Sequence, residues 1–154
     1  MTHDLLAIDM ALLLPEPVSE RARAANEALL AQRPEGFRFD ESHLPHITLA
    51  QQFVRRANLP AWIEQIDPIL RGIRPLPLRG TGVGSSATAA HFVIERTPEI
   101  DNLHRTLLDA VQPFEEASGS ADAFFSEGSD AEPAREPARE KDVAWVSQFR
   151  SHSS

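Results

Sequence analysis

Residues 45–53 read Pro-His-Ile-Thr-Leu-Ala-Gln-Gln-Phe, a length and composition that predict a β-strand. Alternation along this strand directs His46 and Thr48 to one face and Ile47 and Leu49 to the other. An imidazole gives or takes a proton near neutral pH, and a hydroxyl beside it donates a hydrogen bond to a phosphate oxygen. These two side chains on one face suit phosphoryl chemistry without a metal.

The segments on either side of this strand predict a further strand and two helices. Residues 5–14 are almost wholly apolar and predict a mostly buried strand. A helix is expected over 19–32, with Ser19 as its N-cap. A second helix is expected over 60–70, and Gly72 ends it.

The second half of the chain predicts a hairpin followed by a third helix. Residues 73–84 and 90–95 both alternate apolar with polar or small side chains, as the two strands of a hairpin do. Thr97-Pro-Glu99 supplies a capping hydroxyl, a proline at the first position and a carboxylate near the positive end of the helix dipole. The apolar stripe of this helix consists of Ile100, Leu103, Leu107 and Val111.

The order strand, helix, strand, helix, strand, strand, helix predicts an α+β fold rather than a repeating βαβ parallel sheet. A length of 154 residues fits one domain spanning residues 1–154. Residues 115–142 are rich in Ala, Ser, Gly, Pro and charge, too poor in apolar area to offset the entropy of ordering. We therefore expect a disordered acidic insertion at 115–142, followed by a strand at 143–149.

Composition narrows the class of protein. The formal net charge is −8, but nine acidic and three basic residues lie within 115–142, so the rest of the chain is close to neutral and a nucleic-acid partner is not excluded. The absence of cysteine excludes disulfides and a cysteine nucleophile. The apolar run at 5–14 contains Asp9 and is too short to cross a bilayer. The expectation is a cytoplasmic protein with no signal peptide and no membrane span.

Three segments resemble the two-histidine (2H) phosphoesterases, the family that includes bacterial 2′-5′ RNA ligases. The stretch His43-Leu-Pro-His-Ile-Thr-Leu49 is similar to the first signature of that family, and it follows a strand and a helix as it does there. Residues 90–95 and 97–104 are similar to the family's central strand and helix, and 143–154 to the approach to its second motif. The resemblance covers nearly the whole chain apart from the acidic insertion.

The resemblance implies a two-lobed fold, in which antiparallel sheets with flanking helices face each other across a cleft, with one H-x-T/S motif from each lobe. It implies that His46 is a catalytic histidine and Thr48 its phosphate-contacting hydroxyl. The second motif is expected beyond Phe149, past the last residue, so the C-terminal strands are expected to be missing and activity impaired, because removing one acid or base costs about 10²–10⁴ in rate. His152-Ser-Ser154 has the H-x-S spacing of a replacement for this second motif, but fraying of the last residues is the favoured interpretation.

Other histidine, glycine and arginine residues have structural explanations. His43 and His46 form H-x-x-H, but without a third ligand a turn is favoured over a metal site. The stretch 80–84, Gly-Thr-Gly-Val-Gly, lacks the Lys-Ser/Thr of a phosphate loop and suits a hairpin. Arg55 and Arg56 are either phosphate-attracting or, as we favour, a solvated pair. Two further histidines are interpreted as structural, namely His91 and His104.

Three functions are compatible with these features. The first is an RNA-processing phosphoesterase of the 2′-5′ RNA ligase or 2′,3′-cyclic nucleotide phosphodiesterase type, with an RNA or nucleotide phosphodiester as substrate. The second is a non-catalytic relative that binds a nucleotide or an RNA end. The third is a metal-dependent hydrolase, which has only the histidine pair in its favour. The resemblance to the 2H phosphoesterases predicts instead that no metal or cofactor is needed.

Overall fold

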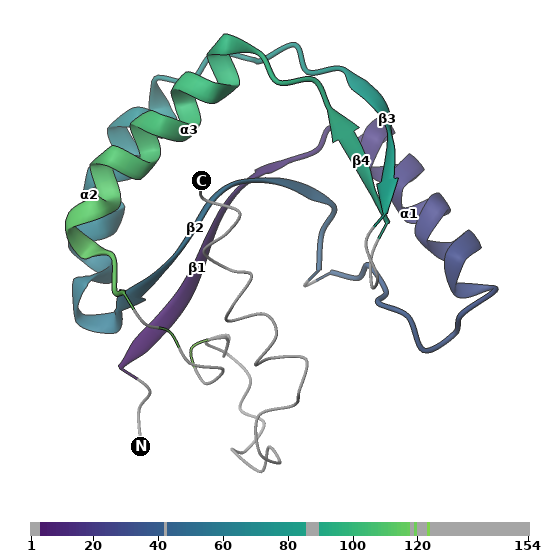
Figure 1. The fold of residues 1–154 in the computed structure, drawn as a ribbon, viewed down its shortest axis with the longest axis horizontal. Helices are drawn as coiled ribbons and strands as arrows, with labels where there is room; N and C mark the ends of the chain where they lie inside the picture. Colours follow the sequence, from purple (N-terminus) through teal and green to yellow (C-terminus); the bar gives the residue numbers. More distant parts are fainter. Residues whose placement is uncertain (1–3, 42, 86–89, 118, 120–122, 124–154) are drawn as a thin grey trace.

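The computed structural model describes residues 4–41, 43–85, 90–117, 119 and 123 (Figure 1). Two antiparallel two-stranded sheets and three α-helices form this part of the chain, which confirms the predicted α+β class. Their order along the chain is β1 (Leu5–Leu13), α1 (Glu16–Leu30), β2 (His46–Arg55), α2 (Leu59–Arg71), β3 (Gly80–Ser85), β4 (Ala90–Ile94) and α3 (Pro98–Val111), with short 3-10 helices at Arg56–Asn58 and Gln112–Phe114.

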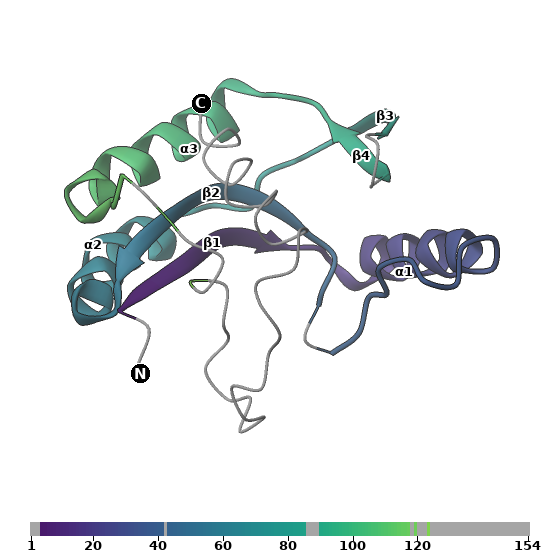
Figure 2. The ribbon, with the colours of Figure 1, turned by 60° about the horizontal axis from the view of Figure 1, so that its bottom comes forward.

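Helices α2 and α3 cover one face of the β1–β2 sheet (Figure 2). The apolar stripe of α3 was predicted from its spacing, and three of its members, Leu103, Leu107 and Val111, are buried against this face. Other apolar side chains complete the core. They include Met10, Leu49, Ala50, Val54, Trp62 and Ile66.

The predicted ends of α2 and α3 are confirmed. Gly72 caps the C-terminus of α2, and Pro60 lies in its first turn. Thr97 caps α3, because its side-chain oxygen accepts a hydrogen bond from the backbone N–H of Ile100 at 3.4 Å. Local sequence alone therefore determines these ends.

The predicted start of α1 was wrong. The helix begins at Glu16 with Pro15 as its N-cap, and Ser19 lies buried inside it. Pro17 does not prevent the earlier start, since backbone N–H groups of a first turn have no intrahelical partner and a proline there forfeits nothing.

The prediction that β1 is mostly buried was also wrong, since Leu6 and Met10 are its two buried side chains. Within the described residues β1 pairs with β2 alone, and the helices cover one face of the pair. The other face carries the candidate site. On that face Leu5 and Ala7 are only partly buried, against Phe53 and Ala123.

The predicted hairpin is confirmed by the antiparallel pairing of β3 with β4, but the predicted start of its first strand at residue 73 was wrong, because β3 begins at Gly80. The glycine-rich stretch at 80–84 is therefore a strand and not a phosphate loop. Gly84 lies opposite His91, and a Cβ placed on Gly84 would come within 2.4 Å of the His91 ring. A larger residue at position 84 would therefore require the exposed His91 ring to move.

Two predictions concern the end of the chain. The strand at 143–149 and the candidate His152 lie outside the described residues, as does most of 115–142. At the start of that segment, Glu115 forms a bridge with Val54 of β2. Over the ranges that the structure describes, no helix has the length and apolar character needed to span a membrane.

Candidate active site

A β-bulge in β2 determines which side chains lie on the open face of the sheet. Met10 pairs with Ala50 while Ala11 pairs with Thr48, so the register skips Leu49. In an unbroken strand, Thr48 and Gln51 would point to opposite faces. With the bulge between them, both side chains contact Asp9 of β1. The irregularity thus gathers residues from both halves of β2 on one face.

His104 of α3 holds the bulge in place. Its Nδ1 is hydrogen-bonded to the backbone carbonyl of Leu49, the residue that the register skips. The carbonyl oxygen can only accept, so His104 is the donor. This contact fits the structural role predicted for His104. Although His104-Arg105-Thr106 repeats the H-x-T spacing, it lies on a helix, where Thr106 donates to the carbonyl of Asn102.

Replacing His104 with leucine is expected to lower the free energy of unfolding by about 1–3 kcal/mol, because the part-buried Leu49 carbonyl loses its donor. Urea denaturation measures this change. His91→Leu is the matched control, since His91 is exposed on β4 and an exposed substitution is expected to stay within about 0.5 kcal/mol. Equal losses in the two variants would contradict the anchoring role.

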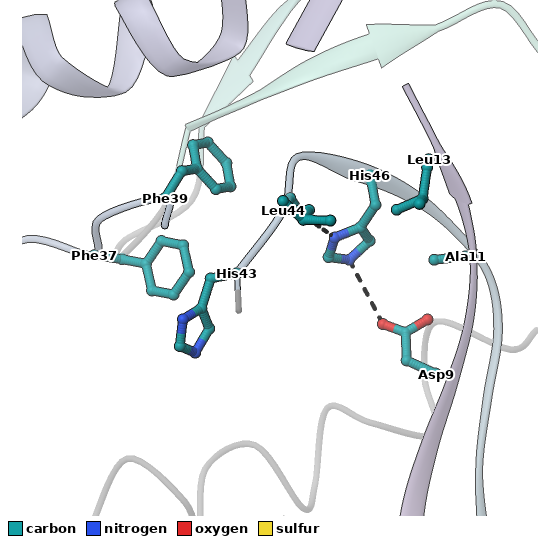
Figure 3. Close-up of a pocket in the computed structure, with 8 residues that line it drawn as sticks. All are labelled: Asp9, Ala11, Leu13, Phe37, Phe39, His43, Leu44 and His46. Atoms are coloured by element: carbon teal, nitrogen blue, oxygen red, sulfur yellow. Dashed lines mark hydrogen bonds and ion pairs between the residues drawn. The ribbon is translucent and has the colours of Figure 1, made fainter. Parts of the chain in front are cut away.

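Four side chains meet on the open face, and three of them surround a single oxygen of the fourth, Asp9. Figure 3 shows the contact between His46 and Asp9. Thr48 Oγ1 donates to Asp9 Oδ2 at 3.2 Å, and Gln51 Nε2 donates to the same oxygen at 3.0 Å. His46 Nε2 lies 3.6 Å from it. The structure thus brings His46 and Thr48 together, as their alternation predicted.

Asp9 and Gln51 were not predicted as site residues. The sequence does carry a signal for Asp9, which is the one charged residue in the apolar stretch 5–14. A charge on a strand with a buried face must point to the other face and find polar partners there. Gln51 had no such signal, because regular alternation places it on the opposite face from Thr48.

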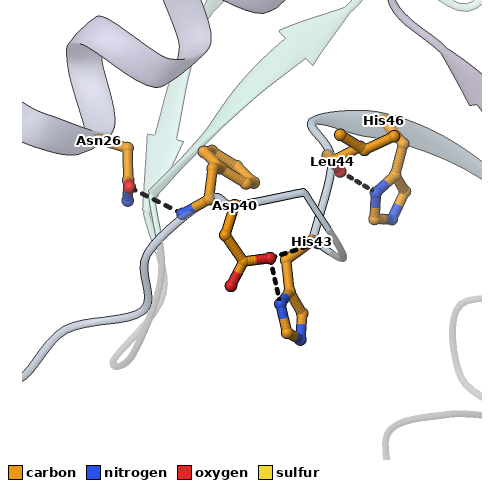
Figure 4. A network of polar contacts seen from close by, with 6 residues as sticks. Asn26, Asp40, His43, Leu44 and His46 are labelled. Atoms are coloured by element: carbon orange, nitrogen blue, oxygen red, sulfur yellow. Dashed lines mark hydrogen bonds and ion pairs between the residues drawn. The ribbon is translucent and has the colours of Figure 1, made fainter. Parts of the chain in front are cut away.

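The ring of His46 is oriented by the backbone just before β2. Its Nδ1 lies 2.7 Å from the carbonyl oxygen of Leu44 (Figure 4). Because that oxygen can only accept, Nδ1 carries the hydrogen, and Nε2 is the atom left to exchange a proton. Nε2 is also the atom that faces Asp9.

A cavity of about 360 Å³ opens beside His46 and has a largely aromatic wall (Figure 3). Phe37 makes edge-to-face contacts with Phe39 and with His43, at centroid distances of 5.6 and 5.3 Å. The remaining lining residues come from β1, from the loop just before β2 and from the first residue of β2. They are Asp9, Ala11, Leu13, Leu44 and His46.

Asn26 of α1 fixes the aromatic wall to the rest of the molecule. Its Oδ1 accepts from the Phe39 N–H at 3.1 Å (Figure 4). Its Nδ2 donates to the Phe37 carbonyl at 2.8 Å. One side chain therefore satisfies two backbone groups of the loop, and it holds both phenylalanines at the cavity.

The two histidines of the H-x-x-H pair both line this cavity, but they are held differently. His43 Nδ1 donates to Asp40 Oδ1 at 2.8 Å. No group of three or more potential ligands that could hold a metal ion occurs in the part of the chain that the structure describes. The histidine pair thus has no third partner there on which a metal site could be built.

Arg55 is engaged in ion pairs and does not line the cavity. Its guanidinium bonds to Glu116 Oε1 and to Asp4 Oδ2, each at 2.7 Å. These hydrogen bonds, that of Glu116 first, raise the pKa of Arg55 above its ordinary value. Arg56 begins a 3-10 helix and is also absent from the cavity wall. Neither arginine supplies positive charge there.

Comparison with known proteins gives one match. A family model described as the 2′-5′ RNA ligase superfamily matches residues 14–133. The matched range contains His46, Thr48 and the aromatic wall, and it leaves out Asp9. No curated protein and no solved structure matches the chain.

Proposed function

Since this chain belongs to the 2′-5′ RNA ligase superfamily, we propose that it is an RNA-processing phosphoesterase. Its substrate is a 2′,3′-cyclic phosphate or a 2′-5′ phosphodiester at a nucleotide or RNA end. The reaction uses no metal ion, and proton transfer involves His46.

The observation that carries the proposal is the convergence of His46 and Thr48 on one anionic oxygen. His46 Nε2 and Thr48 Oγ1 lie 3.6 and 3.2 Å from Asp9 Oδ2. A non-bridging phosphate oxygen has the same charge type and accepting capacity as this carboxylate oxygen. A pair that converges on the carboxylate can therefore converge on a phosphate.

The roles follow from the donors and acceptors. Hydrolysis of a cyclic phosphate needs a group that takes a proton from water and a group that gives a proton to the departing ribose oxygen. With Nδ1 engaged by Leu44, the Nε2 atom of His46 serves in one of these two steps. Thr48 donates its hydroxyl hydrogen to a phosphate oxygen and so orients the phosphorus.

The aromatic wall supports a nucleotide as the ligand. The Phe37 side chain is 60% exposed although it lines the cavity beside His46. An exposed ring next to a phosphate-directed pair provides a surface on which a base can stack, and stacking contributes about 1–3 kcal/mol per base. A phosphate ester without a base would lose this contribution.

Replacing Phe37 with alanine is expected to weaken the binding of adenosine 2′-monophosphate about tenfold, because the base loses its stacking surface. Isothermal titration calorimetry measures the change. Phe92→Ala is the matched control, since Phe92 is also exposed but does not line the cavity. Unchanged affinity in Phe37→Ala would contradict a base-stacking role.

Hydrolysis of a nucleoside 2′,3′-cyclic phosphate in the presence of EDTA tests the proposed activity itself. Turnover that is insensitive to the chelator supports a metal-independent phosphoesterase. Binding of the nucleotide without turnover supports the alternative, a non-catalytic protein that recognises nucleotides or RNA ends. Activity that EDTA abolishes would instead support the metal-dependent hydrolase.

A further inference from the structure

We infer that Asp9 makes this site selective for phosphate esters with one negative charge over those with two, an inference that rests on the proposed function. A phosphodiester, cyclic or linear, carries one charge, and a phosphomonoester carries close to two above the second ionisation near pH 6. Asp9 would therefore admit the substrate and disfavour the hydrolysed product.

The first step of the argument is where the carboxylate lies. Asp9 Oδ2 accepts hydrogen bonds from Thr48 and Gln51 and lies closest to His46 Nε2. These groups already bind an anionic oxygen before any ligand enters. An incoming phosphate oxygen must take the Thr48 hydroxyl from this carboxylate, and it then lies next to a negative charge.

The second step concerns what could neutralise that charge. Within the described residues, the cavity wall contains no lysine and no arginine. Arg55, which lies on β2 with the site residues, is bound to Asp4 and Glu116 instead. Two imidazoles belong to the described wall, and His43 is bound to Asp40, so His46, 3.6 Å from Asp9 Oδ2, is the one that faces this carboxylate.

The third step is the effect on the two ligand classes. Repulsion from a fixed negative charge scales with the charge of the ligand, so a monoester is repelled about twice as strongly as a diester. Hydrolysis of the cyclic ester adds water across one P–O bond, and the product monoester then loses a second proton. The reaction itself thus creates the more strongly repelled species, which favours its release.

The test compares two ligands that differ by one charge. They are 3′-deoxyadenosine 2′-monophosphate and its monomethyl ester. Both lack the 3′-hydroxyl, so neither can form a 2′,3′-cyclic phosphate. Calorimetry at pH 8 gives the affinity of each for the natural protein and for Asp9→Asn. Asparagine keeps the shape and an accepting oxygen for Thr48 and Gln51 but removes the charge. Circular dichroism during heating establishes that the variant is folded.

In Asp9→Asn the monoester is expected to bind about tenfold more tightly relative to the diester than in the natural protein, the effect of one unit charge near a protein surface. Asp109→Asn is the matched control, because it removes the same charge from an exposed position on α3, and it should leave the ratio unchanged. If the ratio of monoester affinity to diester affinity is the same in Asp9→Asn as in the natural protein, the inference is overturned. This includes the outcome in which both affinities fall by the same factor, which would mean that Asp9 only orients His46. Failure of the natural protein and the variant to bind either ligand would overturn the proposed function as well.

Discussion

Replacing His46 with alanine is expected to slow the hydrolysis of a nucleoside 2′,3′-cyclic phosphate by about 10²–10⁴-fold, the usual effect of removing a positioned acid or base. The structure supplies the reason. The Leu44 carbonyl engages Nδ1, and Nε2 faces the oxygen that Thr48 also contacts. No other atom of this side chain is available for proton transfer. The release of phosphomonoester measures the rate, with EDTA present throughout.

The matched control for this prediction is His43→Ala. His43 lines the same cavity and is also an exposed histidine, but its Nδ1 is bound to Asp40. We expect this substitution to change the KM more than the kcat, because His43 contributes to the wall that Phe37 forms. A loss of kcat in His43→Ala as large as that in His46→Ala would mean that His43 also exchanges a proton. Full activity in His46→Ala would refute the role proposed for His46.

Replacing Leu107 with alanine is expected to lower the free energy of unfolding by about 2–5 kcal/mol, which combines lost burial with the cavity left behind. Leu107 is 0% exposed and belongs to the core between α3, α2 and the β1–β2 sheet. A small domain is stable by only about 5–15 kcal/mol, so this loss is a large part of the total. Chemical denaturation followed by circular dichroism measures it.

Leu29→Ala provides the comparison, since Leu29 also lies on a helix but is 52% exposed. Its expected cost is less than about 1 kcal/mol, because an exposed substitution leaves no cavity. If the two substitutions cost the same, the core between α3 and the sheet is not the main source of stability.

Local sequence signals predicted the helix ends that are marked by a capping residue, a proline or a glycine. Thr97 followed by Pro98 determines the start of α3, and Gly72 determines the end of α2. The start of α1 was mistaken because Ser19 was predicted as the N-cap, whereas the helix begins at Glu16 with Pro17 in its first turn, a position that is compatible with a helix. Ser19 competes for the N-cap in the sequence but lies inside the helix.

The candidate site was predicted in part. The positions of His46 and Thr48 follow from period-two alternation, which holds up to Thr48. The positions of Asp9 and Gln51 in the site depend on the register between two strands about forty residues apart in the sequence. No local pattern in 45–53 indicates that Leu49 is skipped, because the contact that stabilises the bulge comes from His104 on a distant helix.

Because of the bulge, the arrangement of the site depends on the number of residues in β2 as well as on their chemistry. Two residues, Leu49 and Ala50, separate Thr48 from Gln51, and the phase of the strand changes between them. A chain shorter by one residue at this point would have one residue between the threonine and the glutamine, which places the two on one face of an unbroken strand with no bulge. The bulge thus accommodates one additional residue in β2, so that the polar side chains before and after it keep a common face.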